Sequence, residues 1–328
     1  MNEPNPITPA FPFKDRRTGL TLFGVFTVLL GGLCALFLPL MIFGQEMAER
    51  TTGVPADTRA VVPAVLMYGI MAVALVWLGI GSIMARRWAR ALLLIFSWTW
   101  LLMGVVMLVF MVVLMPMIME AMQPPGQPPL PDVAKLIVAV VQFAVLSVMF
   151  LLLPAAWVLF YRSPHVQATC EAQDPVVRWT DSCPPQVLAL SVWTALSVPM
   201  LMAMPLAYDS VLPCFGTFLS GWSGTVVYLL WSGLWGYAAW AIHKLKPVGW
   251  WLLTVSSCLL VVSHLITFSR HDVMELYRLM GYPPQQLAQL EKFSSVLSST
   301  TMVWISLLFG VLFLGYMLQV KKHFRRPA

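Results

Sequence analysis

One histidine, His264, lies well inside a long apolar stretch, and hydroxyl residues surround it in the sequence. Imidazole titrates near neutral pH, so a histidine among hydroxyls could bind the polar part of a solute and respond to pH. We predict a polar pocket that is reached from the outer side of a membrane. The alternative is that the hydroxyls only bond between helices, at about 0.6 kcal/mol per contact. The predicted pocket residues are His264, Ser257, Ser263, Thr267, Ser298 and Thr301.

Two glutamates, Glu120 and Glu275, occupy the same place in a repeated motif. Residues 119–129 read MEAMQPPGQPP and residues 274–284 read MELYRLMGYPP, so Met, Glu, Gly and two Pro recur at an offset of 155. One hypothesis is that the two carboxylates form an outer acidic rim around a pseudo-twofold axis. The other is structural. A helix would end near the Gly, which permits a left-handed conformation, and a new helix would begin at the Pro pair.

The segment 161–186 carries Cys170 and Cys183 together with one histidine and three acids. A structural zinc site uses four ligands, which usually come in closely spaced pairs. These two cysteines are 13 positions apart. We therefore assign no metal site, although the sequence leaves open whether this loop binds metal. We expect instead that Arg162, Arg178 and Trp179 hold the loop at the anionic inner leaflet of a membrane.

Charged side chains are missing from the interior of the apolar runs, where no Asp, Glu, Lys or Arg lies away from the ends. A charge at depth in a bilayer costs several kcal/mol and is usually kept for function, so its absence disfavours a proton-coupled pump. No phosphate-binding loop, dinucleotide-binding motif, metalloprotease motif or serine-hydrolase motif occurs in a suitable context. We predict no catalytic residue, no cofactor and no metal site, and we expect that the protein is not an enzyme.

The elements that would position these groups are long apolar helices. The 328-residue chain is 59% hydrophobic and 10% charged, with a mean hydropathy of +0.80. Soluble domains carry about 25% charged residues, so most of this surface requires lipid as its solvent. Eight runs are long enough to span a bilayer, which takes about 20 residues. They cover 18–44, 63–85, 91–119, 133–160, 187–208, 218–242, 248–268 and 294–319.

Basic residues predict the orientation, because Lys and Arg accumulate on the cytoplasmic side of a membrane. If the two termini, the turns 86–90 and 243–247 and the loop 161–186 share one side, that side holds most of the 20 Lys and Arg residues. Both termini are then expected in the cytoplasm, which requires an even number of spans. Since no organelle signal is evident, we expect a multi-pass protein of the bacterial inner membrane.

The repeated motif predicts a duplication, and the same offset also relates Gly81 to Gly236 and Tyr161 to Tyr316. Each half would hold four spans, so both halves would face the same way, as parallel repeats do. The predicted fold is all-α, a polytopic membrane protein whose eight transmembrane helices form a tandem parallel repeat of two four-helix units. We expect a disordered cytoplasmic tail at 1–17, a first unit at 18–161, a cytoplasmic connecting loop at 162–186, a second unit at 187–320 and a basic cytoplasmic tail at 321–328.

Three functions remain open from the sequence. A structural or accessory subunit fits best, because catalytic residues and buried charges are missing. A permease or channel for a neutral or amphipathic solute fits the repeat and the hydroxyls near His264. An intramembrane lipid-modifying enzyme, with Glu120, Glu275 or Asp209 as outer carboxylates, fits least, because no nucleophile–base pair is visible. The expected partners are membrane lipid and a further membrane protein, with no nucleic acid.

Overall fold

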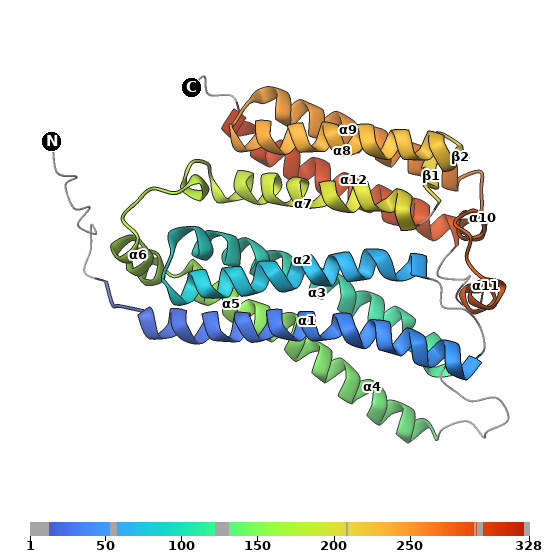
Figure 1. The fold of residues 1–328 in the computed structure, drawn as a ribbon, viewed down its shortest axis with the longest axis horizontal. Coiled ribbons are helices and arrows are strands. Elements are labelled where there is room, and N and C mark those ends of the chain that lie inside the picture. The colour runs from blue at the N-terminus through green and yellow to red at the C-terminus, as the bar shows by residue number, and fades with distance from the viewer. Residues whose placement is uncertain are drawn as a thin grey trace. The chain divides into compact units, whose positions relative to one another are not determined.

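The chain folds almost entirely into helices (Figure 1). The computed structural model describes residues 13–52, 58–121, 131–207, 209–291, 293 and 298–324. Within these residues, eight helices are long and apolar enough to cross a membrane, so the prediction of an all-α protein with eight such helices is confirmed. They are α1 (Arg17–Thr52), α2 (Thr58–Ile83), α3 (Arg87–Ala121), the continuous run α4 (Asp132–Ser147), η1 (Val148–Leu152) and α5 (Leu153–Arg162), then α7 (Pro185–Ala207), α8 (Gly221–His243), α9 (Pro247–Phe268) and α12 (Ser299–Val320).

Short elements connect the long helices. They are α6 (Pro164–Gln173), η2 (Trp179–Asp181), the antiparallel pair β1 (Leu212–Cys214) and β2 (Thr217–Leu219), α10 (Val273–Leu279), α11 (Pro284–Glu291) and η3 (Lys321–Phe324). The sixth apolar helix begins at Gly221, a few residues later than predicted, because β2 occupies residues that the prediction gave to the helix. Gly216 and Gly221 have φ angles of +93° and +59°, which glycine adopts without steric cost.

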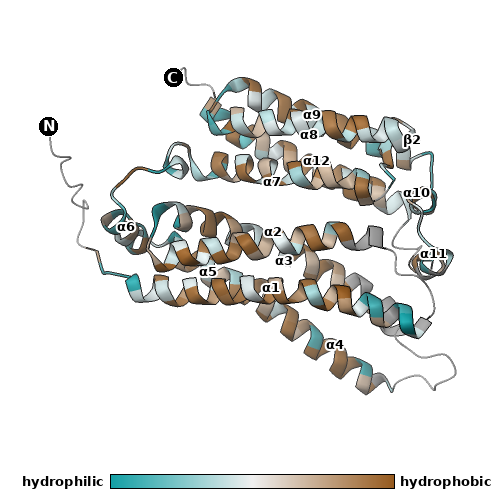
Figure 2. Cartoon of the chain, viewed as in Figure 1, coloured by the Kyte–Doolittle hydropathy of each residue, from teal (hydrophilic) through white to brown (hydrophobic). Residues whose placement is uncertain are grey.

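The chain divides into two compact units. The first unit comprises Met1–Leu30 and Ala74–Asp181, and the second comprises Gly31–Val73 and Ser182–Ala328. The boundary at Asp181–Ser182 lies inside the connecting loop that the sequence predicts at 162–186. Two of the boundaries between the units fall inside α1 and α2. The sequence prediction instead assigned whole helices to each unit. Along the long helices apolar residues predominate, and hydrophilic residues gather at the turns and in α6 (Figure 2).

The core of the first unit lies where α1, α2, α3, α5 and α6 meet. Leu20, Leu93 and Tyr161 are fully buried in it. The hydroxyl of Ser82 donates to the carbonyl of Leu20 at 3.0 Å and lies 2.7 Å from the hydroxyl of Tyr161. The ring of Phe23 stacks on Phe160 with centroids 4.3 Å apart. These contacts join α1, α2 and α5 through one buried hydrogen-bond chain and one aromatic pair.

A π-helical turn, η1, interrupts the fourth span. Pro154 has no N–H to donate to the carbonyl four residues earlier, and its ring would clash with that carbonyl in a regular helix. The carbonyl in question belongs to Phe150, which lies inside η1. On α3, Gly104 lies so close to this carbonyl that an added Cβ would overlap it. The close approach of α3 to the π turn therefore depends on Gly104 having no side chain.

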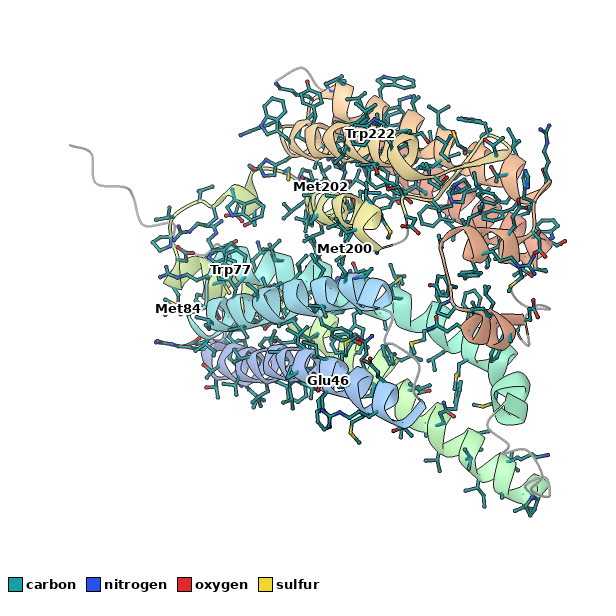
Figure 3. The ribbon with its side chains drawn as sticks, turned by 45° about the vertical axis from the view of Figure 1, so that its right-hand side comes forward. Glu46, Trp77, Met84, Met200, Met202 and Trp222 are labelled. Carbon is teal, nitrogen blue, oxygen red and sulfur yellow. The ribbon has the colours of Figure 1, made fainter. Side chains whose placement is uncertain are left out.

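Large apolar side chains remain exposed on the spanning helices. Trp77 on α2 is 51% exposed and Trp222 at the start of α8 is 79% exposed, and both are labelled in Figure 3 together with the exposed Met84 and Met202. A soluble protein rarely exposes large apolar patches of this kind. The exposed helix surfaces are those expected of helices that face lipid.

Candidate functional site

A cavity of about 470 Å³ lies between α7, α8, α9 and α12 of the second unit. This volume falls within the range of roughly 300–1,000 Å³ that is typical of small-molecule pockets. Most of its wall is apolar and aromatic. That part of the wall includes Trp193, Trp235, Leu260, Ile305, Phe309 and Phe313.

Helical spacing brings the polar lining residues to the cavity. On α9, Leu253, Ser257, Leu260 and His264 lie at intervals of three or four residues and so share one face. Thr194 and Ser197 on α7 and Ser306 on α12 complete the polar part of the wall. The sequence prediction named His264 and Ser257, and the structure places both of them on this cavity.

The hydrogen bond of His264 fixes which ring nitrogen carries the proton. Its Nδ1 lies 2.8 Å from the carbonyl oxygen of Leu260, one turn earlier in α9. A carbonyl can only accept, so Nδ1 must be the donor. In the neutral ring the other nitrogen, Nε2, then has a lone pair and can only accept a hydrogen bond. His264, which lines the cavity, therefore has one ring nitrogen that can accept a hydrogen bond.

The hydroxyls of the wall differ in how far they are satisfied by the protein. Thr194 donates to the carbonyl of Leu190 at 2.7 Å, and Ser197 donates to the carbonyl of Thr194 at 2.8 Å. Ser257 and Ser306 make no side-chain hydrogen bond within the described part of the chain. These two hydroxyls can therefore both donate to a bound molecule and accept from it.

Ser263 and Thr267 lie on α9 but bind the β1–β2 hairpin instead of lining the cavity. The Ser263 hydroxyl donates to the carbonyl of Pro213 and accepts from the N–H of Phe215, each at 3.0 Å. The buried Thr267 hydroxyl accepts from the N–H of Gly216 at 3.0 Å. Both residues therefore satisfy the hairpin backbone at the C-terminal end of α9.

Ser298 and Thr301 lie at the beginning of α12. The Ser298 hydroxyl accepts a hydrogen bond from the N–H of Thr301 at 3.2 Å, and the two hydroxyls are 2.9 Å apart. This is the usual N-cap arrangement, which satisfies a free backbone donor of the first turn. The six predicted pocket residues are thus distributed over three places: the cavity, the hairpin contact and the helix cap.

Glu275, one member of the predicted acidic rim, pairs with a histidine. The Oε2 atom of Glu275 lies 2.9 Å from Nδ1 of His271, while Nε2 of His271 lies 3.0 Å from the carbonyl oxygen of Gly216. Both partners are acceptors, so both bonds form together only when the imidazole is protonated. The bond to Glu275, and secondly the bond to Gly216, raises the pKa of His271.

The second copy of the repeated motif forms a helical corner. After α10, Gly281 takes a φ angle of +78°, and α11 begins at Pro284. This is the arrangement expected from the structural interpretation of the motif. The side chain of Glu120 and residues 122–130 of the first copy lie outside the described residues. The acidic rim formed by two glutamates therefore stays a prediction.

The loop 161–186 carries a network of ion pairs in the first unit. Asp174 is only 2% exposed and accepts two hydrogen bonds from Arg178, at 2.7 and 3.1 Å, with Arg86 at 3.7 Å. The hydrogen bonds from Arg178 lower the pKa of Asp174. Arg87 pairs with Asp181 at 3.2 Å. The loop is therefore attached to the beginning of α3 by charge pairs that the sequence prediction did not contain.

Cys170, which the sequence raised as a candidate zinc ligand, is fully buried beside this network. Burial raises the pKa of its thiol to about 12, so the thiol is neutral near pH 7. Zinc binds the thiolate form, so the protonated thiol is a poor ligand. Among the residues that the structure describes, no cluster of three or more His, Cys, Asp or Glu side chains is arranged to hold a metal ion.

The chain matches no protein-family model, and no curated protein or solved structure is significantly similar to it. The cavity residues that sequence reasoning missed are chiefly Trp193, Trp235 and Ser306. A signal was present, because Ser306, Phe309 and Phe313 lie at helical spacing on one face of α12. The same spacing is equally compatible with ordinary helix packing, so the sequence alone could not identify a cavity.

Proposed function

We propose that the protein is a multi-pass membrane protein that takes up an apolar or amphipathic molecule from the bilayer into the cavity between α7, α8, α9 and α12. This places it in the permease or carrier class. The observation that supports the proposal is a ligand-sized cavity whose wall is mostly aromatic and aliphatic, with a few polar groups. Small-molecule sites typically have this composition.

An accessory role in a membrane complex is the second candidate. It is favoured by the exposed apolar residues Val176, Val177 and Trp179, which lie between α6 and α7, outside the spanning helices. Such residues can contact either the membrane surface or a membrane-protein partner. The cavity favours the first candidate, because helices that serve only a structural role have no need of a ligand-sized space.

We further propose that the protein lies in a bacterial inner membrane with both termini in the cytoplasm. Two basic turns support this orientation. Arg86 lies in the turn between α2 and α3 and Arg87 begins α3, and the turn between α8 and α9 carries Lys244 and Lys246. Basic residues beside spanning helices favour the cytoplasmic side. A reporter enzyme that is active only in the cytoplasm, fused to the C-terminus, should be active, and an inactive fusion would contradict the orientation.

The same two turns support the proposed duplication. Ala85 and Leu245 both have positive φ angles, of 51° and 54°. The next residue in each turn donates its N–H to the carbonyl five residues earlier. Arg86 donates to Gly81 at 2.9 Å, and Lys246 donates to Ala241 at 2.8 Å. L-residues with positive φ are uncommon outside glycine, Asn and Asp, so their presence in both turns favours a common origin.

The contacts beside these turns are also alike. An added Cβ on Gly81 would meet Ala89, and an added Cβ on Gly249 would meet Ala241. One glycine and one alanine therefore let the two helices approach closely in each turn, with their positions exchanged. In this register Gly81 corresponds to Ala241, at an offset of 160, and not to Gly236 as the offset of 155 predicts. Close approach through small residues is typical of membrane helices.

The proposed uptake is tested by filling the cavity. Ser306→Phe places a large ring in the cavity wall, and Leu308→Trp provides a control on an exposed position of the same helix. After purification in a mild detergent, extraction and mass spectrometry should find an apolar molecule with the unmodified protein and with Leu308→Trp. Ser306→Phe should retain much less of it. Equal amounts in all three proteins, or none in any of them, would contradict the proposal.

A further inference from the structure

The polar groups of the cavity lie near one level of the helix pair α9 and α12. Trp250 donates its indole N–H to the carbonyl of Met317 at 2.8 Å, and Val261 packs against Gly310. The residue number rises along α9 while it falls along α12, so the two helices are antiparallel. Three residues beyond Val261 lies His264, and four residues before Gly310 lies Ser306. At about 1.5 Å rise per residue these two side chains reach the same level of the cavity.

The two groups at this level have complementary hydrogen-bonding abilities. In the neutral ring of His264, Nε2 can accept a hydrogen bond, because Nδ1 donates to the carbonyl of Leu260. The Ser306 hydroxyl has no partner in the described chain and can donate. Among the described residues that line the cavity, none is Asp, Glu, Lys or Arg. A charged ligand head would therefore lack a counter-charge, and burying an unpaired charge is costly.

We infer that the molecule bound in this cavity is an apolar alcohol. Its hydroxyl donates to Nε2 of His264 and accepts from the hydroxyl of Ser306, while its hydrocarbon body packs against the aromatic wall. A hydroxyl is the simplest group that donates and accepts at once. A plain hydrocarbon would leave both protein groups unpaired, and a carboxylate would place a second acceptor against Nε2.

The inference rests on the proposed function and specifies its ligand. It predicts a preference among molecules with the same chain length. Binding can be followed through the fluorescence of the tryptophans in the wall, Trp193 and Trp235. The full chain in detergent micelles is titrated with 1-hexadecanol, with hexadecane and with hexadecanoate. A tenfold difference in affinity corresponds to about 1.4 kcal/mol, which two hydrogen bonds together can contribute, so the alcohol should bind about tenfold more tightly than hexadecane.

Two substitutions of His264 separate hydrogen bonding from packing. His264→Phe keeps a ring but removes the acceptor, so the preference for the alcohol over hexadecane should disappear. His264→Gln keeps an acceptor at the end of the side chain, so the preference should be largely retained. Since the comparison between ligands is made within each protein, a change in overall stability does not affect it. The wild-type titration remains decisive if His264→Phe does not fold.

The outcomes distinguish the inference from the function on which it rests. Equal binding of alcohol and hydrocarbon by the wild type, or tighter binding of hexadecanoate, overturns the alcohol inference and leaves uptake into the cavity standing. The same holds if His264→Phe keeps the full preference. Failure of all three molecules to bind, together with no effect of Ser306→Phe on co-purified molecules, overturns the proposed function and the inference with it.

Discussion

His271 precedes α10 and Glu275 lies in its first turn, and the imidazole Nδ1 of His271 is 2.9 Å from the carboxylate Oε2 of Glu275. The second ring nitrogen lies 3.0 Å from the carbonyl of Gly216, at the tip of the β1–β2 hairpin. When it is protonated, this ring therefore joins the segment after α9 to the hairpin by two hydrogen bonds. Ser263 and Thr267 hold the same hairpin by uncharged hydrogen bonds.

This arrangement predicts a pH dependence of stability. The bond to Glu275 chiefly raises the pKa of His271, and the nearby Arg270 opposes the rise. A group whose pKa is higher in the folded state stabilises fully below its unfolded pKa, about 6.5 for histidine. That stabilisation is lost as pH rises through the folded value. Thermal unfolding between about pH 5.5 and pH 9 should therefore show a larger loss in the wild type than in Glu275→Gln, which keeps only the bond from His271 to Gly216. Parallel curves for the two proteins would refute the prediction.

Thr267 should control opening of the hairpin. Thr267→Val keeps the shape of the side chain but leaves the N–H of Gly216 without its acceptor. Leaving a buried donor unpaired costs about 1–3 kcal/mol. Hydrogen exchange at the hairpin should become about tenfold faster or more, while exchange in α7 stays unchanged. As a control, Ser269→Ala removes an exposed hydroxyl that bonds within its own turn and should leave exchange unaltered.

Asp174 should be important for holding α6 and η2 against α3. Asp174→Asn removes the charge that pairs with Arg178 and Arg86. Both arginines are about one-third exposed, so we discount the cost of a fully buried pair to roughly 1–3 kcal/mol. Glu171→Gln is the control, because Glu171 is more exposed and lies 4.0 Å from Arg87. The denaturant midpoint should fall clearly for the first variant and barely for the second, and equal shifts would contradict the assignment.

The same carboxylate sets the response to acid. Its pKa is lowered in the folded state by the hydrogen bonds from Arg178. The stabilisation is therefore present above the unfolded pKa of Asp, about 3.9, and is lost as pH falls through the lower folded value. On acidification, the stability of Asp174→Asn should therefore decrease less than that of the wild type. The denaturant midpoints of the two proteins, measured below about pH 5, test this.

Two glycine substitutions should act in opposite directions. Gly104→Ala adds a Cβ that overlaps the carbonyl of Phe150, and overpacking of this kind costs about 1–3 kcal/mol. Gly233→Ala on α8 meets no atom within 4 Å. It should be neutral or stabilise by up to about 1 kcal/mol, because alanine favours helix. Thermal unfolding of the two variants tests this, and a loss of equal size in both would rule out the packing explanation.

The spanning helices could be predicted because each is a long apolar run, and hydropathy depends on composition alone. The hairpin could not, because β1 and β2 have three residues each and their pairing is fixed by Ser263 and Thr267 on another helix. The same limit applies to Asp174, whose burial depends on arginines of a different segment. Short elements and charge pairs are set by tertiary contacts, which a single sequence does not display.

The sequence predicted only part of the candidate site, again because tertiary contacts decide which residues reach it. His264 and Ser257 were recognisable as polar residues in an apolar run, and they share one helix face. Ser263 lies next to His264 in sequence, but one residue turns the side chain by about 100° around the helix, away from the cavity. Ser298 and Thr301 were grouped with the pocket by composition, although a hydroxyl before a helix is most simply a cap.

The π turn at Val148–Leu152 has a consequence for how the fourth span tolerates change. A π turn contains one extra residue. That residue rotates the side chains after the turn by about 100° around the helix axis relative to the side chains before it. On α5 the residues Pro154, Trp157, Val158 and Tyr161 are buried, whereas α4 exposes Leu136, Val140 and Phe143 among others. Within the described residues α4 has no buried position, so it offers no packed face that a larger side chain would disturb. Substitutions to larger apolar residues should be harmful on one side of residue 148 and harmless on the other.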